Sequence, residues 1–89
     1  MDETELREAF VRYVRGIEAE LQPDVNLQPE WASFLRTVEH HYKPDATEDE
    51  LDDFRRMVAA MYGMMQQRGE YFIPPQLKKP LEDAIRDYT

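Results

Sequence analysis

Four methionines close together in the second half of the chain are the residues most suggestive of binding chemistry: Met57, Met61, Met64 and Met65. Their spacing puts the thioethers on one side of a predicted helix. Flexible, polarisable side chains of this kind either fill a core or form a surface that adapts to different partners. Both interpretations stay open from the sequence, and the second predicts a groove or a homodimer seam that accepts an apolar helix.

Aromatic residues near the methionines extend the same candidate surface. Tyr62 lies between two of the methionines, and Tyr71 and Phe72 follow the predicted helix. Aromatic side chains are frequent anchors of protein interfaces. The predicted partner-binding site therefore consists of seven residues: Met57, Met61, Tyr62, Met64, Met65, Tyr71 and Phe72.

An acidic run at residues 45–53 holds six carboxylates and is the most obvious candidate for binding Ca²⁺ or Mg²⁺. An EF-hand loop beginning at Asp45 would need glycine where Glu50 stands and glutamate where Arg56 stands. Acids in a first helical turn stabilise the positive end of the helix dipole. We therefore predict a helix start here and no metal site, with an acidic patch facing a partner as the alternative.

The two histidines, His40 and His41, are neighbours near the end of a predicted helix. Adjacent helical residues diverge by about 100°, so the two rings are poorly placed to hold one ion. The sequence predicts one solvated and one half-buried histidine. A metal site or enzyme that uses Glu39, both histidines and the acidic run is the weakest of three functional hypotheses.

Covalent catalysis has few candidates in this chain. There is no cysteine, and Ser33 is the single serine and falls within a helical pattern. The three glycines form none of the nucleotide-binding or nucleophile motifs. We expect neither an enzyme nor a cofactor, and no catalytic or metal-binding residue is predicted.

The length of 89 residues predicts a single domain spanning residues 1–89. The formal charge of −8 disfavours direct binding to nucleic acid or to an anionic membrane. No apolar run reaches the length of a membrane span, and the first residues lack the features of a secretory signal. We therefore expect a cytoplasmic location. The acid excess lies in residues 1–8 and 45–53, at two predicted helix starts.

The apolar spacing predicts an all-α fold, a small antiparallel four-helix bundle with an extended strap at residues 70–74. The four helices are expected at about residues 4–21, 29–42, 47–68 and 80–88.

The boundaries of these helices follow from capping residues, prolines and one glycine. Thr47 and Glu50 have capping-box spacing, and Gly69 suits the left-handed position past a helix end. Pro23 follows the end of the first helix, and Pro80 is expected to begin the last helix.

One face of the predicted helix 47–68 carries the expected packing seam, at Leu51, Phe54, Val58, Met61 and Met65. Arg55 and Arg56 are expected on the surface, in weak ion pairs with Asp52 or neighbouring acids.

Three functional classes remain after these exclusions. The first is a small acidic protein-interaction module, such as an adaptor, accessory subunit or regulator, that binds a protein partner or a second copy through the methionine and aromatic surface. The second is an acidic inhibitor or antitoxin-like protein that masks a basic nucleic-acid-binding surface on its target. The third is the metal-binding protein or enzyme.

Overall fold

Four α-helices make up the computed structural model, which describes residues 2–22, 24 and 26–88: α1 (Glu3–Leu21), α2 (Pro29–Tyr42), α3 (Glu48–Arg68) and α4 (Pro75–Tyr88). The described residues contain no strand, which confirms the all-α prediction. Pro23 lies outside the described residues, so its role in ending the first helix stays a prediction.

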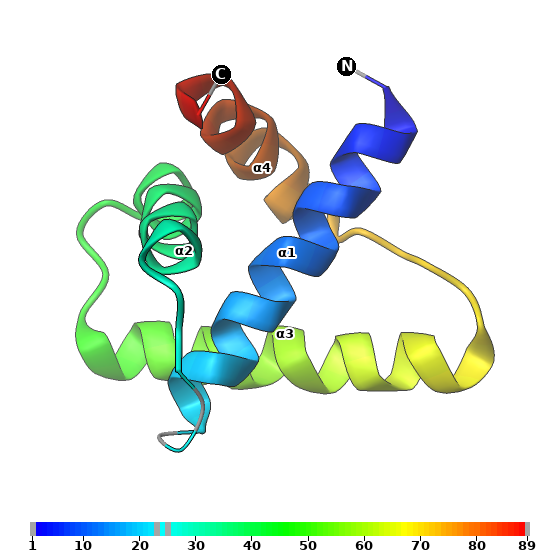
Figure 1. The fold of residues 1–89 in the computed structure, drawn as a ribbon, viewed down its shortest axis with the longest axis horizontal. Coiled ribbons are helices and arrows are strands. Elements are labelled where there is room, and N and C mark those ends of the chain that lie inside the picture. The colour runs from blue at the N-terminus through cyan, green and yellow to red at the C-terminus, as the bar shows by residue number, and fades with distance from the viewer. Residues whose placement is uncertain (1, 23, 25, 89) are drawn as a thin grey trace.

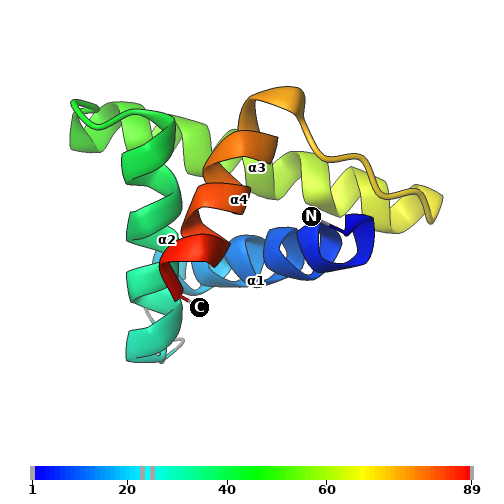
Figure 2. The same cartoon turned by 90° about the horizontal axis from the view of Figure 1, so that it is seen from above.

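The helices cross one another obliquely around α1, which contacts each of the other three. α1 crosses α3 (Figure 1), and α2 lies across the C-terminal part of α1 (Figure 2). α4 packs against both α2 and α1. The second half of α3 extends beyond this crossing to the connection after α3 (Figure 1).

The hydrophobic core is built from the apolar stripes of all four helices. Its most deeply buried apolar side chains are Phe10, Tyr13, Val14, Ile17, Leu35, Val38, Val58, Leu77 and Leu81. The α1 stripe supplies the largest share, as expected for the helix that contacts the other three.

Capping interactions mark the start of α1 and both ends of α3. The Asp2 carboxylate accepts a hydrogen bond from the backbone N–H of Thr4 at 3.0 Å, and the Thr47 hydroxyl accepts one from the N–H of Glu50 at 3.2 Å. These bonds satisfy amide groups that have no partner inside the helix. α3 ends at Gly69, whose φ of 73° is left-handed.

The predicted start of the last helix was wrong: α4 begins at Pro75 and not at Pro80. Pro75 takes the first helical position, where a missing N–H costs nothing. Pro80 lies inside the helix, and its ring is buried with Leu77 and Leu81. The apolar stripe that these three residues form with Ala84 is continuous, so its burial outweighs the lost backbone hydrogen bond.

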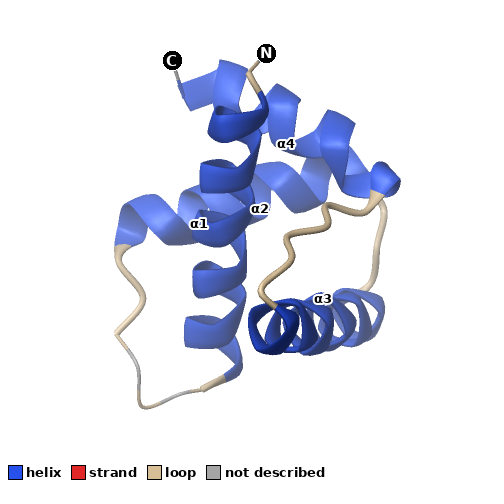
Figure 3. Ribbon diagram, turned by 90° about the vertical axis from the view of Figure 1, so that its right-hand side faces the viewer, coloured by secondary structure: helices blue, strands red, loops and turns tan. Residues whose placement is uncertain are grey.

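The connection between α3 and α4 contains neither helix nor strand at residues 70–74. It leaves the end of α3 and returns to the start of α4 (Figures 1 and 3). We call residues 70–74 the strap, as predicted from the sequence. Ile73 packs against the core, whereas Tyr71 and Phe72 are exposed.

Candidate functional site

The buried face of α3 is rotated relative to the predicted packing seam. Its buried residues are Arg55, Val58, Tyr62 and Met65, whereas Leu51, Phe54 and Met61 are only half-buried. The seam prediction therefore holds at Val58 and Met65 alone. The rotation occurs because the long side chain of Arg55 is taken into the interior together with the apolar residues.

A second stripe of α3 faces outward as a result of this rotation. Met57 is 60% exposed and Met64 is 55% exposed, and Met61 lies half-buried between them. These side chains are three or four residues apart, so they form one continuous apolar strip along the helix. Two exposed methionines on one strip are unusual on a soluble surface, because apolar side chains of this size normally gain free energy from burial.

A groove of about 480 Å³ lies between this strip and the strap. We call it the methionine groove, and its lining residues are Met57, Ala60, Met61, Met64, Met65, Arg68, Glu70 and Phe72. Phe72 is 59% exposed and forms the side of the groove that the strap contributes. The lining is mostly apolar, and its two charged residues, Arg68 and Glu70, come from the junction of α3 and the strap.

A smaller cavity of about 250 Å³ extends the methionine groove toward the start of α4. The two share Met57, Met61 and Phe72, so they form one continuous depression along α3. At its far end, the rings of Tyr42 and Phe54 stack with their centroids 4.3 Å apart. The depression therefore has aromatic groups at one end and flexible thioethers along its length.

The structure brings five of the seven predicted site residues together: Met57, Met61, Met64, Met65 and Phe72. Tyr62 instead lies in the core, 6% exposed, with its ring edge-on to Phe10 at 6.0 Å. Tyr71 lies next to Phe72 in the strap but lines a different cavity, on α1.

The prediction that Arg55 lies on the surface was wrong, although its predicted ion pair with Asp52 is present at 3.5 Å. Its guanidinium is buried and donates two hydrogen bonds of 2.6 Å to the carboxylate of Glu39, one to each oxygen. A third bond of 2.9 Å joins it to Glu20, which also accepts one from Arg36 at 2.7 Å. Through these charged hydrogen bonds, Arg55 of α3 is connected to Glu39 of α2 and Glu20 of α1.

The surroundings of this cluster raise the pKa of two of its side chains, Arg55 and Tyr13. Hydrogen bonds to Glu39 raise the pKa of the Arg55 guanidinium, which stays charged. Burial, with the negative charge of Glu39, raises the pKa of the Tyr13 phenol, which stays neutral. The charged hydrogen bonds of Arg55 to Glu39 and Glu20 therefore hold three helices together.

The apolar stripes of α2 and α3 carry a signal in the sequence that points to this buried cluster. Glu39 follows Val38 on the buried stripe of α2, and Arg55 precedes Val58 by one turn on the buried stripe of α3. A charged residue in phase with an apolar stripe, matched by an opposite charge in phase with another stripe, indicates a buried pair.

The histidines and the acidic run do not form a metal site. The Nε2 atom of His41 lies 2.8 Å from a carboxylate oxygen of Asp87 on α4, and both histidines are exposed, so the prediction of one half-buried histidine was wrong. In the acidic run, Glu50 accepts a hydrogen bond from Lys43. Within the part of the chain that the structure describes, no three histidine or acidic side chains gather as metal ligands, and no helix is long and apolar enough to cross a membrane.

Comparisons of the chain with protein-family models, with curated proteins and with solved structures find no match. The geometry of the chain itself must therefore carry the functional argument. Its most distinctive exposed feature is the methionine groove, whose lining is mostly apolar, with Arg68 and Glu70 as its charged residues.

Proposed function

We propose that the protein is an interaction module that binds an amphipathic helix of a protein partner in the methionine groove. The observation that carries this proposal is the exposure of Met57, Met64 and Phe72 around one continuous apolar depression. Grooves of this kind take the apolar face of a helix, and methionines adapt their shape to it.

The charges around the groove favour a partner helix with basic residues at one end. Asp53 is exposed one helical turn before Met57, and the acidic first turn of α3 lies beyond it. Lys or Arg side chains of a helix lying along α3 would meet these carboxylates while its apolar face fills the groove. Such complementarity accelerates association and fixes the direction in which the partner lies.

A second copy of this chain is a less suitable occupant than a partner of opposite charge. Each copy carries a formal charge of −8, so two copies repel each other. The acidic start of α3, at the end of the groove, would also meet a surface of the same sign. The homodimer therefore remains an outcome that the experiment must distinguish.

The acidic-inhibitor alternative gains little from the structure. Such a protein needs free carboxylates spread over one face to imitate phosphates. Here Glu48, Asp49 and Glu50 all lie in the first turn of α3, where the helix dipole favours them, and Glu50 is paired with Lys43. No observation favours this function over helix binding.

Titration with a synthetic amphipathic peptide tests the proposal. The peptide has leucines on one face and lysines near one end, and its helicity and affinity are measured by circular dichroism and calorimetry. We expect binding to the native chain and a loss of at least about tenfold in affinity for the double variant Met57→Glu/Met64→Glu, because charges in the groove must be desolvated.

Arg56→Glu is the matched control, because it changes the net charge of α3 by the same −2 at an exposed residue outside the groove. It should bind the peptide at least as well as the native chain. Equal affinity of the native chain and the methionine double variant would contradict the proposal. A dimer by light scattering that the double variant abolishes would assign the groove to a second copy instead.

A further inference from the structure

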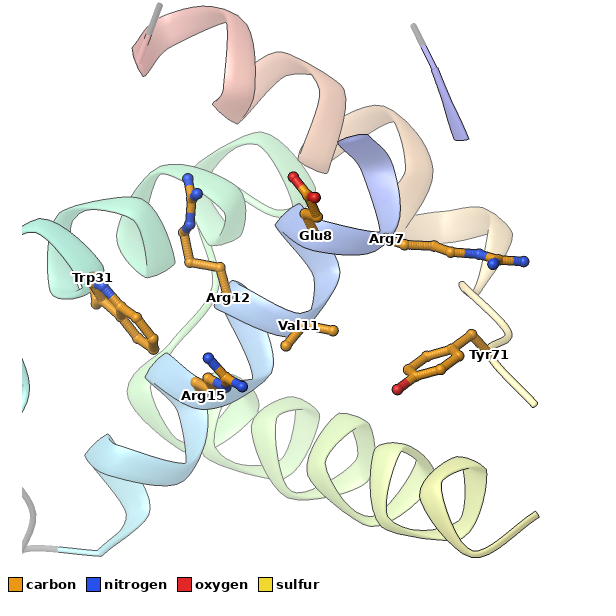
Figure 4. Close-up of a pocket in the computed structure, with 7 residues that line it drawn as sticks. All are labelled: Arg7, Glu8, Val11, Arg12, Arg15, Trp31 and Tyr71. Carbon is orange, nitrogen blue, oxygen red and sulfur yellow. The ribbon is translucent and has the colours of Figure 1, made fainter. Parts of the chain in front are cut away.

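A second cavity, of about 430 Å³, lies on the outer side of α1 and differs in character from the methionine groove. We call it the arginine trough, and its lining residues, drawn in Figure 4, are Arg7, Glu8, Val11, Arg12, Arg15, Trp31 and Tyr71. Three arginines in one depression are notable on a chain whose formal charge is −8.

The positive charge of the trough is not neutralised by the protein itself. Arg12 and Arg15 are exposed, and among the described residues neither forms an ion pair with a carboxylate. Arg7 contacts Glu3 only at 3.4 Å, and both side chains are at least half exposed. Elsewhere Arg36, Arg55 and Arg86 each have a carboxylate partner, whereas the Arg12 guanidinium lies over the Phe34 ring, 5.7 Å from the ring centroid.

Apolar and aromatic groups accompany these arginines. Val11 lies half-buried in the middle of the trough, with Trp31 of α2 on one side and Tyr71 of the strap on the other (Figure 4). Trp31 is half-buried and Tyr71 is 49% exposed, so both rings present a face or an edge to a ligand. Aromatic rings and arginines together are the residue types most enriched at binding hot spots.

We propose that the arginine trough binds an acidic peptide segment that carries an apolar or aromatic side chain. Carboxylates of the segment would accept paired hydrogen bonds from the planar guanidinium groups of Arg12 and Arg15. Its apolar side chain would lie on Val11 between the two rings. The volume of the trough suits a few residues of an extended chain.

Peptide carboxylates suit this trough better than the phosphates of a nucleic acid. A long polyanion would be repelled by the acidic remainder of the molecule, whereas a short segment meets only the local field of the arginines. Glu8 also lines the trough, where its carboxylate can accept a hydrogen bond from a backbone N–H of a bound peptide.

The trough is separate from the methionine groove, and binding there does not depend on the proposed function. Tyr71 lines the trough beside α1, whereas its neighbour Phe72 lines the groove beside α3. The strap thus contributes one aromatic ring to each site. A partner with an acidic segment and a separate amphipathic helix would be able to contact both.

Trp31 is the single tryptophan of the chain and lies in the trough, so its fluorescence reports binding directly. The probe is a short synthetic peptide of alternating glutamate and phenylalanine, and a second peptide has glutamine at every glutamate position. We expect saturable change of the Trp31 emission with the acidic peptide, weakening as salt rises, and none with the amide peptide.

Charge reversal at the two unpaired arginines gives the decisive comparison. Arg12→Glu/Arg15→Glu should weaken binding of the acidic peptide by about tenfold or more, the loss expected for charged hydrogen bonds. Lys78→Glu/Lys79→Glu is the matched control, because it makes the same change of charge at exposed residues outside the trough. Circular dichroism of both variants confirms that they fold.

Three results would overturn the proposal. They are the absence of any response of Trp31 to the acidic peptide, equal loss of affinity in the two double variants, and equal or tighter binding of a single-stranded oligonucleotide. Because Met57→Glu/Met64→Glu leaves the trough intact, it should retain affinity for the acidic peptide. The failure of one site is therefore distinguishable from the failure of the other.

Discussion

The buried hydrogen bonds of Arg55 join three of the four helices. Its guanidinium is 1% exposed and meets Glu39 through both carboxylate oxygens, while Glu20 accepts a further bond. A buried ion pair gains little over apolar residues of the same size, but breaking it by removing one partner is costly. The pair therefore fixes how three helices meet more than it adds to stability.

Glu39→Gln should lower the free energy of unfolding by about 3–5 kcal/mol, because it leaves Arg55 buried without its carboxylate. The double variant Glu39→Leu/Arg55→Met should recover most of this loss, since neither charge is then buried alone. Urea unfolding of the single and double variants measures both effects. A double variant no more stable than Glu39→Gln would contradict this account of the pair.

The pair between Lys43 and Glu50 predicts a dependence of stability on pH. A hydrogen bond from Lys43 lowers the pKa of Glu50 below that of an ordinary glutamate. A carboxylate whose folded pKa is lowered stabilises the fold above its unfolded pKa, and this contribution is lost as pH falls through the folded value. The advantage of the native chain over Glu50→Gln should therefore be present near pH 7 and shrink below about pH 4.5.

Denaturant unfolding across this range measures the Glu50 contribution, which is small because both groups are exposed. Glu18→Gln is the control: Glu18 is exposed and its side chain forms no ion pair among the described residues. A pH profile of Glu50→Gln that runs parallel to the native one would show that the Lys43 pair contributes nothing.

At the residue scale, the sequence predicts those structural features that depend on residues close by in the chain. The cap of Thr47 on Glu50 and the left-handed Gly69 each depend on a few adjacent residues, and both predictions are confirmed. The burial of Arg55 depends on Glu39 and Glu20, which are 16 and 35 positions away. Charge and spacing within one helix carry little information about such distant partners.

At the scale of elements, the rotation of α3 creates the exposed methionine strip. The helix spacing was predicted correctly, but Arg55 and Tyr62 are buried where the expected seam has their neighbours Phe54 and Met61, while Val58 and Met65 are buried as expected. Hydrophobic periodicity identifies a helix more reliably than the angle at which that helix faces its neighbours. For this reason the sequence left open whether the methionines belong to the core or to a surface.

The start of α4 illustrates how a local rule can be overridden. A proline is favoured in a first turn, and this applies equally to Pro75 and Pro80. The choice was decided by packing, because Leu77 is 1% exposed and belongs to the same buried stripe as Leu81. The burial of Leu77 was not visible without the positions of α1 and α2.

Two glycines of α3 should respond in opposite directions to alanine. Gly63 lies inside the helix, and a Cβ atom there meets nothing within 4 Å, so Gly63→Ala should stabilise the fold by about 0.5–1 kcal/mol. Gly69 has a φ of +73°, so Gly69→Ala should destabilise it by about 1 kcal/mol. Thermal unfolding of the two variants measures both changes, and equal effects would contradict these backbone assignments.

At the scale of the whole molecule, two depressions of different chemistry lie on either side of the strap. The methionine groove is apolar and continues into the acidic start of α3, whereas the arginine trough on α1 is basic. The formal charge of −8 conceals this division, because the carboxylates concentrate at the starts of α1 and α3. The sequence suggested the first surface and gave no indication of the second.

The central claim is that the methionine groove binds an amphipathic helix, and methyl NMR of the chain labelled at the methionine and isoleucine methyls tests it most directly. On titration with the leucine and lysine peptide, the signals of Met57, Met61 and Met64 should shift together and saturate. The methyl signals of Ile17, which is fully buried, should stay in place. Unmoved methionine signals, or an equal shift of Ile17, would contradict the claim.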